Sequence, residues 1–281
     1  MRVEQLEPDV VIFRGDAYES VATAILHRGR VLLIDTLAGS VDAEIMRHHI
    51  EQNLGASVRL IVMTHYMSDH MAGLDLFPDA QIVAHQHYMH TFLSQRARSA
   101  EDHARFVAPT ITFTGSFTFG WGPHTIEVFH NPGKTMCAIG IDIPAYDLVL
   151  CGDAVVGHMA YLSNSAPELI DEALIRFQRL GRGRIVPGHI GVLEGRAFGD
   201  ARHYLDRLRE CVVRARRADS HEPSIRSIPI EDCLAAGIIP TEFEREWHGR
   251  NLDRVEERQL FALEKSGCPL PARDPAPFRL R

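Results

Sequence analysis

Acidic and imidazole side chains gather at three short places along this sequence. One segment holds two histidines and one aspartate within six residues, namely His65, Asp69 and His70. Asp153 and His189 stand in two later segments, and each closely follows a short apolar run. Imidazole and carboxylate groups are donors that zinc, iron and manganese accept in proteins. These five residues are therefore candidate ligands of a metal ion, and they indicate metal-assisted chemistry.

Buried strands are predicted immediately before each of these segments. The apolar runs 58–64, 148–151 and 184–186 have the length and composition of buried strands. Loops at strand ends can direct several side chains to one point while the sheet fixes the geometry. A further run ends in Asp35, which we expect to orient a loop or a ligand histidine. The candidate ligands are thus expected to converge.

The remaining pattern alternates strands and helices in the first third and is rich in strands in the middle. Further strands are expected at 10–14, 20–27, 30–35, 81–84, 110–119, 125–130 and 138–143. Helices are expected at 40–53, 85–98, 167–180 and 198–218. Two or three short helices are expected to follow, up to about residue 266.

The ordered motifs resemble those of the metallo-β-lactamase superfamily. The first motif of that family, usually HxHxDH, stands as HYMSDH at 65–70, and the PGH turn stands as Pro-Gly-Lys at 132–134. The bridging aspartate and the last histidine of the family match Asp153 and His189. The resemblance covers roughly residues 10–195 and implies an α/β fold, the αββα four-layer sandwich, in the glyoxalase II and lactonase-like hydrolase branch.

The resemblance also implies a division of the chain. Residues 1–199 would form the metallo-β-lactamase-like domain, and residues 200–281 would form a C-terminal helical cap and tail. C-terminal helices roof the active-site cleft in related proteins, so the cap is expected to set the size of the substrate. Trp247 and His248 are expected to pack against the core and not to reach the pocket.

Two departures from the family pattern concern the first metal site. That site uses three histidines in the family, but here only His65 is retained, because Met67 and Lys134 replace the other two. All four ligands of the second site are present. They match Asp69, His70, Asp153 and His189. The resemblance therefore implies one divalent metal, Zn²⁺ with Fe²⁺ or Mn²⁺ as alternatives, and leaves open whether His65 is a fifth ligand. Two dications beside the Lys134 ammonium would be strongly unfavourable. With a single dication, the ammonium would instead pair with Asp153 or Asp69.

The function implied is hydrolysis of a small-molecule lactone, ester, thioester or amide. Asp69 would hold the metal and orient the nucleophile, and Lys134 would stabilise a developing oxyanion. Four side chains are expected to line the substrate pocket. They are Tyr66, Met67, His158 and Tyr161. Two alternatives stay open: a mononuclear iron oxygenase, and a non-catalytic binding protein on the same scaffold, which a sealed pocket mouth would favour.

The composition argues against several other classes of protein. The 281 residues are 45% hydrophobic and 24% charged, as in ordinary soluble proteins, and the net charge of −7 offers no basic face for nucleic acid. No apolar run is long enough for a membrane span, and the first residues lack the pattern of a signal peptide. The five cysteines form no CxxC pair. We therefore expect a cytoplasmic protein whose partner is a small molecule, and leave a homodimer open.

Overall fold

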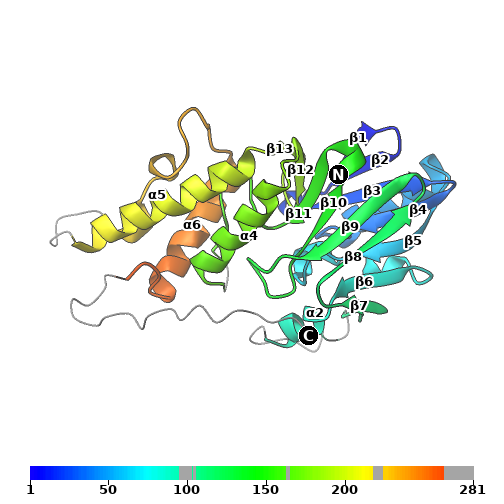
Figure 1. Cartoon of the computed structure of the whole chain (residues 1–281), viewed down its shortest axis with the longest axis horizontal. Coiled ribbons are helices and arrows are strands. Elements are labelled where there is room, and N and C mark those ends of the chain that lie inside the picture. Colours follow the sequence, from blue (N-terminus) through cyan, green and yellow to red (C-terminus); the bar gives the residue numbers. More distant parts are fainter. Residues whose placement is uncertain (95–102, 104–105, 163–164, 218–223, 263–281) are drawn as a thin grey trace.

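Two β-sheets lie face to face, and helices pack against part of their outer faces (Figure 1). The computed structural model describes residues 1–94, 103, 106–162, 165–217 and 224–262. Within these residues the sheets have seven and six strands. The arrangement confirms the expected α/β class and four-layer sandwich.

The first sheet follows the chain order from β1 to β7. Its strands are β1 (Arg2–Glu7), β2 (Val10–Arg14), β3 (Val21–His27), β4 (Arg30–Ile34), β5 (Ser57–Val62), β6 (Gln81–His85) and β7 (Ile111–Phe113). Neighbours from β1 to β4 are antiparallel, and neighbours from β4 to β7 are parallel. The parallel half places the carboxyl ends of β4 and β5 at one edge of the sheet.

The second sheet has the order β13-β12-β11-β10-β9-β8. Its strands are β8 (Ser116–Trp121), β9 (His124–His130), β10 (Ile139–Ile143), β11 (Leu148–Gly152), β12 (Arg184–Pro187) and β13 (Leu193–Glu194). β11 and β12 are parallel, whereas the other neighbours are antiparallel. The carboxyl ends of β11 and β12 therefore lie side by side, and both lead into predicted ligands.

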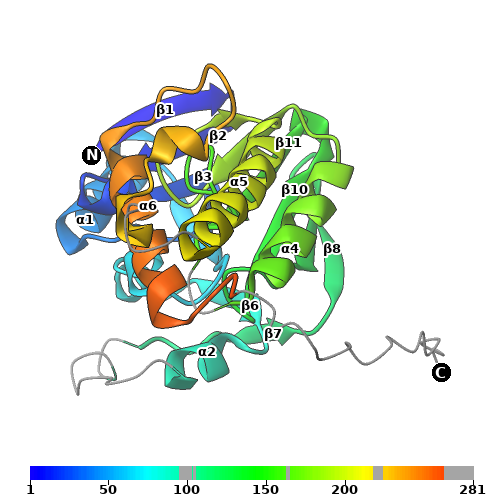
Figure 2. The ribbon, with the colours of Figure 1, turned by 90° about the vertical axis from the view of Figure 1, so that its left-hand side faces the viewer.

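Helices flank the sheets on both sides (Figure 2). The α-helices are α1 (Ser40–His48), α2 (Tyr88–Ser94), α4 (Pro167–Arg179), α5 (Ala197–Arg217) and α6 (Glu242–Glu257). A π-helical turn, η2 (His49–Asn53), continues α1. The short 3-10 turns are η1 (Ala17–Glu19), η3 (Ser68–His70), η4 (Leu74–Leu76), η5 (Pro144–Tyr146), η6 (Ile225–Ser227) and η7 (Ile230–Asp232).

Three hydrophobic clusters fill the spaces between the layers. The alternation along β4 shows how they are separated, because successive side chains of a strand point to opposite faces. Leu32 and Ile34 belong to the cluster between the two sheets, and Val31 and Leu33 belong to the cluster under α1 and α2. β4 is apolar on both faces because both faces are covered.

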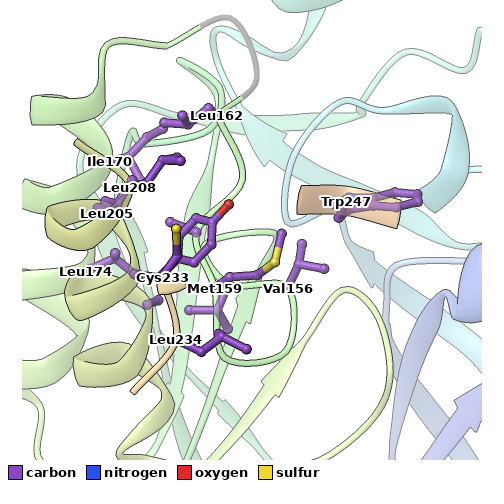
Figure 3. Close-up of a cluster of buried hydrophobic side chains, with 14 of the residues drawn as sticks. Val156, Met159, Leu162, Ile170, Leu174, Leu205, Leu208, Cys233, Leu234 and Trp247 are labelled. Carbon is purple, nitrogen blue, oxygen red and sulfur yellow. The ribbon is translucent and has the colours of Figure 1, made fainter. Parts of the chain in front are cut away.

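The third cluster joins the outer face of the second sheet to α4, α5 and α6. Figure 3 shows part of it, with Leu174 of α4 and Leu205 and Leu208 of α5 gathered near Met159. The predicted domain boundary at 199/200 falls within α5, and the division into two domains stays a prediction. Residues 263–281 of the predicted cap and tail lie outside the described residues.

Two sequence expectations need correction. The single strand expected at 110–119 is two strands, because the chain leaves the first sheet after β7 and enters the second sheet at β8. The residues between them, Thr114 and Gly115, carry the change of sheet. The N-terminal strand β1, which pairs with β2, was not expected, because its residues are mostly exposed and strongly charged.

Candidate metal centre

Three strand ends bring the predicted ligands together. β5 leads into the 3-10 turn η3, which carries Asp69 and His70. Asp153 follows β11 and His189 follows β12. One ligand atom from each of these four residues lies within 4.8 Å of the others. The two sheets thus contribute two candidate ligands each.

Buried polar atoms of this cluster lack hydrogen-bond partners. Five such atoms converge here: His65 Nε2, Asp69 Oδ1, His70 Nε2, Asp153 Oδ1 and His189 Nε2. Buried polar atoms are normally satisfied, so a group of unpaired polar atoms at one point calls for an explanation such as an ion. Nitrogen and carboxylate oxygen donors suit a divalent transition metal, and the four-residue set fits one such ion.

The nearest distances place one carboxylate oxygen at the centre of the set. Asp153 Oδ1 lies 3.2 Å from His70 Nε2 and 3.4 Å from His189 Nε2. Asp69 Oδ2 lies 3.5 Å from His189 Nε2. The Asp69 side chain is 15% exposed, whereas those of Asp153, His70 and His189 are at most 1% exposed. Asp69 is therefore the candidate ligand nearest to solvent.

His189 is oriented by the carbonyl of Tyr18. His189 Nδ1 lies 2.7 Å from that oxygen and donates to it, which leaves Nε2 as the acceptor that faces the carboxylates. Tyr18 has φ of 55°, a left-handed conformation that is unusual for a residue other than glycine. A strained turn thus presents the carbonyl to the ligand histidine.

Asp35 orients the ligand loop, as the sequence predicts. Its carboxylate accepts hydrogen bonds from the backbone N–H and the hydroxyl of Thr64, at 2.8 and 2.6 Å. Asp35 Oδ2 also lies 3.2 Å from His70 Nδ1. A carboxylate behind a ligand histidine fixes the ring and raises its basicity. The same Thr64 oxygen lies 3.0 Å from His65 Nδ1, so Nε2 of His65 turns toward Asp153.

Lys134 occupies the other side of Asp153. It belongs to the loop between β9 and β10, and its ammonium forms a buried ion pair with Asp153 Oδ2. The two oxygens of this carboxylate therefore face different partners. Oδ2 contacts Lys134, and Oδ1 faces His70 and His189. The ring of Tyr161 lies beneath the ammonium, with 5.1 Å from Nζ to the ring centroid. A cation at such a distance is attracted by the ring.

The charges of the cluster shift one another's pKa values. Burial raises the pKa of the Asp153 carboxyl, but Lys134, His189 and His70 outweigh burial and hold it well below its usual range. Burial lowers the pKa of Lys134, yet Asp153 and Asp69 leave it above its ordinary value. Burial also lowers the pKa of His70, and the same two carboxylates raise it well above the usual value. Because a metal requires neutral imidazole, binding at His70 would release a proton.

His65 lies beside the four-residue set without belonging to it. Its ring centroid is 4.5 Å from that of His70, and its Nε2 is 3.5 Å from Asp153 Oδ2. Met67, two residues further on, is half-buried just before η3. Whether His65 is a ligand stays open.

A glycine allows the strands to approach this closely. A Cβ on Gly188 would lie 2.2 Å from Asp153 Oδ1 and 2.5 Å from His70 Cε1, which real side chains do not tolerate. Any larger residue before His189 would push the ligands apart.

Helix α6 covers His189. The ring of Phe243 lies 5.4 Å from that of His189, and the ring of Trp247 lies 5.9 Å from it. Trp247 packs in the core, as the sequence predicts, and its ring also lies beside that of His189. His248 behaves as expected, because its nitrogens bond Tyr204 and the Ile228 carbonyl inside the core.

The four residues expected in a substrate pocket have different surroundings. Tyr161 is at the site beneath Lys134, and Met67 is near it in sequence. Tyr66 is turned away, and its ring lies in an aromatic cluster of the core. That cluster includes Tyr88, Phe92 and Phe106. His158 bonds Asp200 of α5 through Nδ1, at 3.0 Å, so it ties a loop to a helix.

Two residues at the centre were not predicted from the sequence. Tyr18 acts through its backbone, and Phe243 lies far along the chain, so neither has a motif. The scarcity of lysine was a usable signal: two of the 30 basic residues are lysines, and one of them is Lys134. In a chain that otherwise uses arginine, a buried lysine is a selective choice of a compact ammonium.

The cluster is nearly closed. A cavity of about 10 Å³, bordered by His65, Lys134 and Asp153, adjoins it. That is the volume of roughly one water molecule. Among the described residues, the exposed part of the centre is therefore the side of Asp69.

A family comparison agrees with this geometry. The sequence profile of the metallo-beta-lactamase superfamily matches residues 15–212, which include all the candidate ligands. The chain belongs to the metallo-beta-lactamase superfamily. Most members of this superfamily are hydrolases and its members bind divalent metals. No curated protein matches the whole sequence closely enough to add to this.

Solved structures of the superfamily share the fold. The metallo-beta-lactamase from Pontibacter korlensis is 20% identical, with a TM-score of 0.60, and the match covers 70% of this chain and 95% of that chain. The DIM-1 metallo-beta-lactamase is 17% identical, with a TM-score of 0.58, over 73% of this chain and 96% of that chain. None of these likenesses identifies a glyoxalase II or lactonase branch, which stays a prediction.

A longer solved structure matches nearly the whole of this chain. The stereoselective inverting sec-alkylsulfatase Pisa1 from Pseudomonas sp. is 14% identical, with a TM-score of 0.66 over 98% of this chain. This chain spans about half of that protein, 52%. In the described part of the chain, no helix combines the length and apolar character that a membrane crossing requires.

Proposed function

We propose that this chain is a hydrolase that holds one divalent cation, preferably Zn²⁺. The ligands would be Asp69, His70, Asp153 and His189. The observation that carries the proposal is the convergence of unpaired buried polar atoms on one point. The substrate would be a small-molecule lactone, ester, thioester or amide.

Charge balance supports a single ion. The buried carboxylates of Asp35 and Asp153 and the partly exposed carboxylate of Asp69 carry three negative charges, and Lys134 carries one positive charge. One dication with neutral histidines balances these charges, whereas a second dication would leave two excess positive charges in a low dielectric. The Lys134 ammonium would thus take the place of the second metal of the family.

Different residues of the chain would have different roles in the hydrolysis. When bound, a dication supplies Lewis acidity and lowers the pKa of bound water toward 7. Asp69 is the ligand nearest to solvent, so its carboxylate would orient the attacking water. The Lys134 ammonium would donate a hydrogen bond to the oxygen on which negative charge develops.

Elemental analysis tests the metal content. Protein purified without a chelating tag should retain about one equivalent of metal, and Asp153→Ala should retain none. His90→Ala is the matched control, because His90 is exposed on α2, away from the described cluster, and this variant should keep one equivalent. Two equivalents in the parent protein would contradict the single-ion proposal.

A substrate panel tests the reaction class. The metal-loaded protein should turn over one of the lactone, ester, thioester or amide probes, and Asp153→Ala should not. A sec-alkyl sulfate and a β-lactam belong in the panel because of the structural relatives. Bound iron with oxygen consumption would instead indicate an oxygenase.

One observation favours a second candidate, a non-catalytic metal-binding protein. The centre is nearly closed by its own side chains and by α6. Full metal content without turnover of any probe would favour this candidate over the hydrolase.

A further inference from the structure

Helix α6 presents a stripe of buried polar residues to the rest of the molecule. Glu244, His248 and Asn251 are 1%, 5% and 0% exposed. Spacings of four and three place them on one face of the helix. Buried polar groups are costly unless they are hydrogen-bonded, so the partners of this stripe reveal what it holds in place.

Asn251 holds the backbone on both sides of Tyr161. Its Oδ1 accepts from the N–H of Leu162 at 2.7 Å, and its Nδ2 donates to the carbonyl of Ala160 at 2.9 Å. Nδ2 also donates to the hydroxyl of Tyr204 at 3.0 Å. Both amide hydrogens and the amide oxygen are therefore used.

Glu244 holds the start of the same loop. Its Oε1 accepts from the N–H of His158 at 2.8 Å. A Cβ on Gly157, which has φ of +61°, would lie 2.2 Å from that oxygen, so the loop lies directly on the carboxylate. α6 thus fixes two points of the segment that runs from Asp153 to Leu162, and Figure 3 shows Leu162 and Met159 of this segment near the helices.

Tyr161 lies between the backbone groups that Asn251 holds and the candidate metal centre. Its neighbours on either side are tied to Asn251, and its ring lies 5.1 Å from Lys134 Nζ. Trp247 of α6 lies on another side, with 6.0 Å between ring centroids. A displacement of the backbone at 160–162 would therefore move the ring that borders the ammonium.

We propose that Asn251 is a positioning residue for Lys134. Its amide fixes the backbone around Tyr161, and the Tyr161 ring confines the Lys134 ammonium beside Asp153. The consequence for turnover rests on the proposed function, because Lys134 acts on a substrate only if the centre is catalytic. The positioning itself is a property of the folded chain.

The test uses the lysine count of the chain. Because Lys134 and Lys265 are the two lysines, protein labelled with ¹³C-lysine gives two sets of side-chain signals. In the zinc-loaded parent, the ε-methylene protons of Lys134 should be shifted upfield by the Tyr161 ring, with Lys265 as internal reference. Tyr161→Phe should keep this shift and Tyr161→Leu should lose it.

Asn251→Ala is the decisive variant. It should lose the upfield shift of Lys134, and acetylation of Lys134 by a water-soluble active ester, followed by peptide mass spectrometry, should become at least about tenfold faster. Val255→Ala, a buried position on the same helix, is the matched control and should leave both readouts unchanged. If Asn251→Ala does not fold, Asn251→Asp is used in its place. It retains the acceptor for Leu162 and lacks the amide donor, so Lys134 should lose part of its upfield shift.

The proposal is overturned if Asn251→Ala or Tyr161→Leu folds and leaves the Lys134 signal and acetylation rate as in the parent. It is also overturned if Val255→Ala produces the same change as Asn251→Ala, because the effect would then be general loosening. Neither readout requires turnover. An inactive parent protein with the expected Lys134 signals would therefore contradict the proposed hydrolase and leave the positioning intact.

Discussion

Lys134 is the residue that most distinguishes this centre. An ammonium is a compact point charge, whereas a guanidinium is a broad planar fork, so lysine suits the small buried space beside Asp153 better than arginine would. Its ion pair uses Asp153 Oδ2, the oxygen that also faces His65 Nε2 at 3.5 Å. The same space would receive a second cation if the ammonium were removed and a donor supplied.

Lys134→His should therefore convert the protein to one that binds two metal equivalents. The new imidazole, together with His65 and the freed oxygen of Asp153, offers three donors that suit Zn²⁺. Equilibrium dialysis followed by elemental analysis measures the stoichiometry. Lys134→Met removes the ammonium and supplies only a weak donor, so it should stay at one equivalent. One equivalent in both variants would contradict the view that Lys134 replaces a metal.

Asp35→Asn should weaken metal binding without removing a ligand. The amide cannot hold His70 and the Thr64 donors as the carboxylate does, and loss of such a partner typically costs 10–100-fold in metal affinity. Competition with a fluorescent zinc chelator measures the affinity. Asp142→Asn is the matched control, because Asp142 is equally buried but pairs with Arg182 at the second sheet. Equal affinities for both variants would show that Asp35 does not support the centre.

At the scale of the elements, the candidate ligands were predictable because they close apolar strands. The runs that became β5, β11 and β12 are recognisable locally, and parallel neighbours must end at the same edge. The change of sheet at Thr114 and Gly115 was not predictable. The alternation of apolar residues continues through it, and only pairing with β6 and β9 decides which sheet each half joins.

The family resemblance predicts C-terminal helices above the cleft, but it does not predict which of their side chains face the centre. Trp247 and Phe243 come some 50 residues after His189, and an aromatic residue on a helix reads as core packing. Tyr66 shows the opposite case, because its place inside the ligand motif suggested the pocket, whereas the backbone of the loop between β5 and η3 turns its side chain into the core. Side-chain direction depends on the local backbone, which sequence spacing does not specify.

The hydrogen bonds at the start of α6 lead to a prediction about stability. Glu244 accepts three hydrogen bonds, from His158 N–H and from the N–H and hydroxyl of Thr241. Glu244→Ala should lower the free energy of unfolding by about 3 kcal/mol, because the variant loses a charge-assisted hydrogen bond and leaves a buried donor without its acceptor. Thr241→Ala removes only the cap and should cost about 1 kcal/mol. Urea denaturation measures both, and equal costs would contradict a role of Glu244 beyond the cap.

At the scale of the whole molecule, the centre joins the two sheets. Asp69 and His70 follow the first sheet, and Asp153 and His189 follow the second. Backbone contacts reinforce the seam, since Val21 N–H donates to the Gly188 carbonyl at 2.8 Å. A metal bound by all four side chains would therefore stabilise the sandwich as well as the site.

Removal of the metal should lower the stability of the whole sandwich. A ligand that binds only the folded state at a free concentration 1,000 times its dissociation constant stabilises it by about 4 kcal/mol. Calorimetry before and after treatment with a chelator measures the loss, which re-addition of Zn²⁺ should reverse. Asp153→Ala should show no response to either treatment. A response equal to that of the parent would place the stabilising metal elsewhere.

At the edge of the sandwich opposite the candidate metal centre, a charged side chain also links the two sheets. Asp9, from the turn between β1 and β2, accepts hydrogen bonds from Tyr146 of η5 and from His124 of β9, the latter at 2.7 Å. Partial burial raises the pKa of the Asp9 carboxyl, but these two donors outweigh it and leave the pKa below its ordinary value. The ionised carboxylate is therefore the form that the folded state stabilises.

Asp9→Asn should consequently destabilise the protein near neutral pH and lose this effect in acid. Above about pH 4, the ordinary value for aspartate, both states are ionised and the full contribution is present. As the pH falls through the lower pKa of the folded state, that contribution disappears, and the two proteins should converge in unfolding free energy. Urea titrations of the metal-free proteins between pH 7 and pH 3 measure the difference, with the exposed Asp79→Asn as control. A difference that stayed constant down to pH 3 would mean that the hydrogen-bond geometry, and not the charge of Asp9, links the two sheets at this edge.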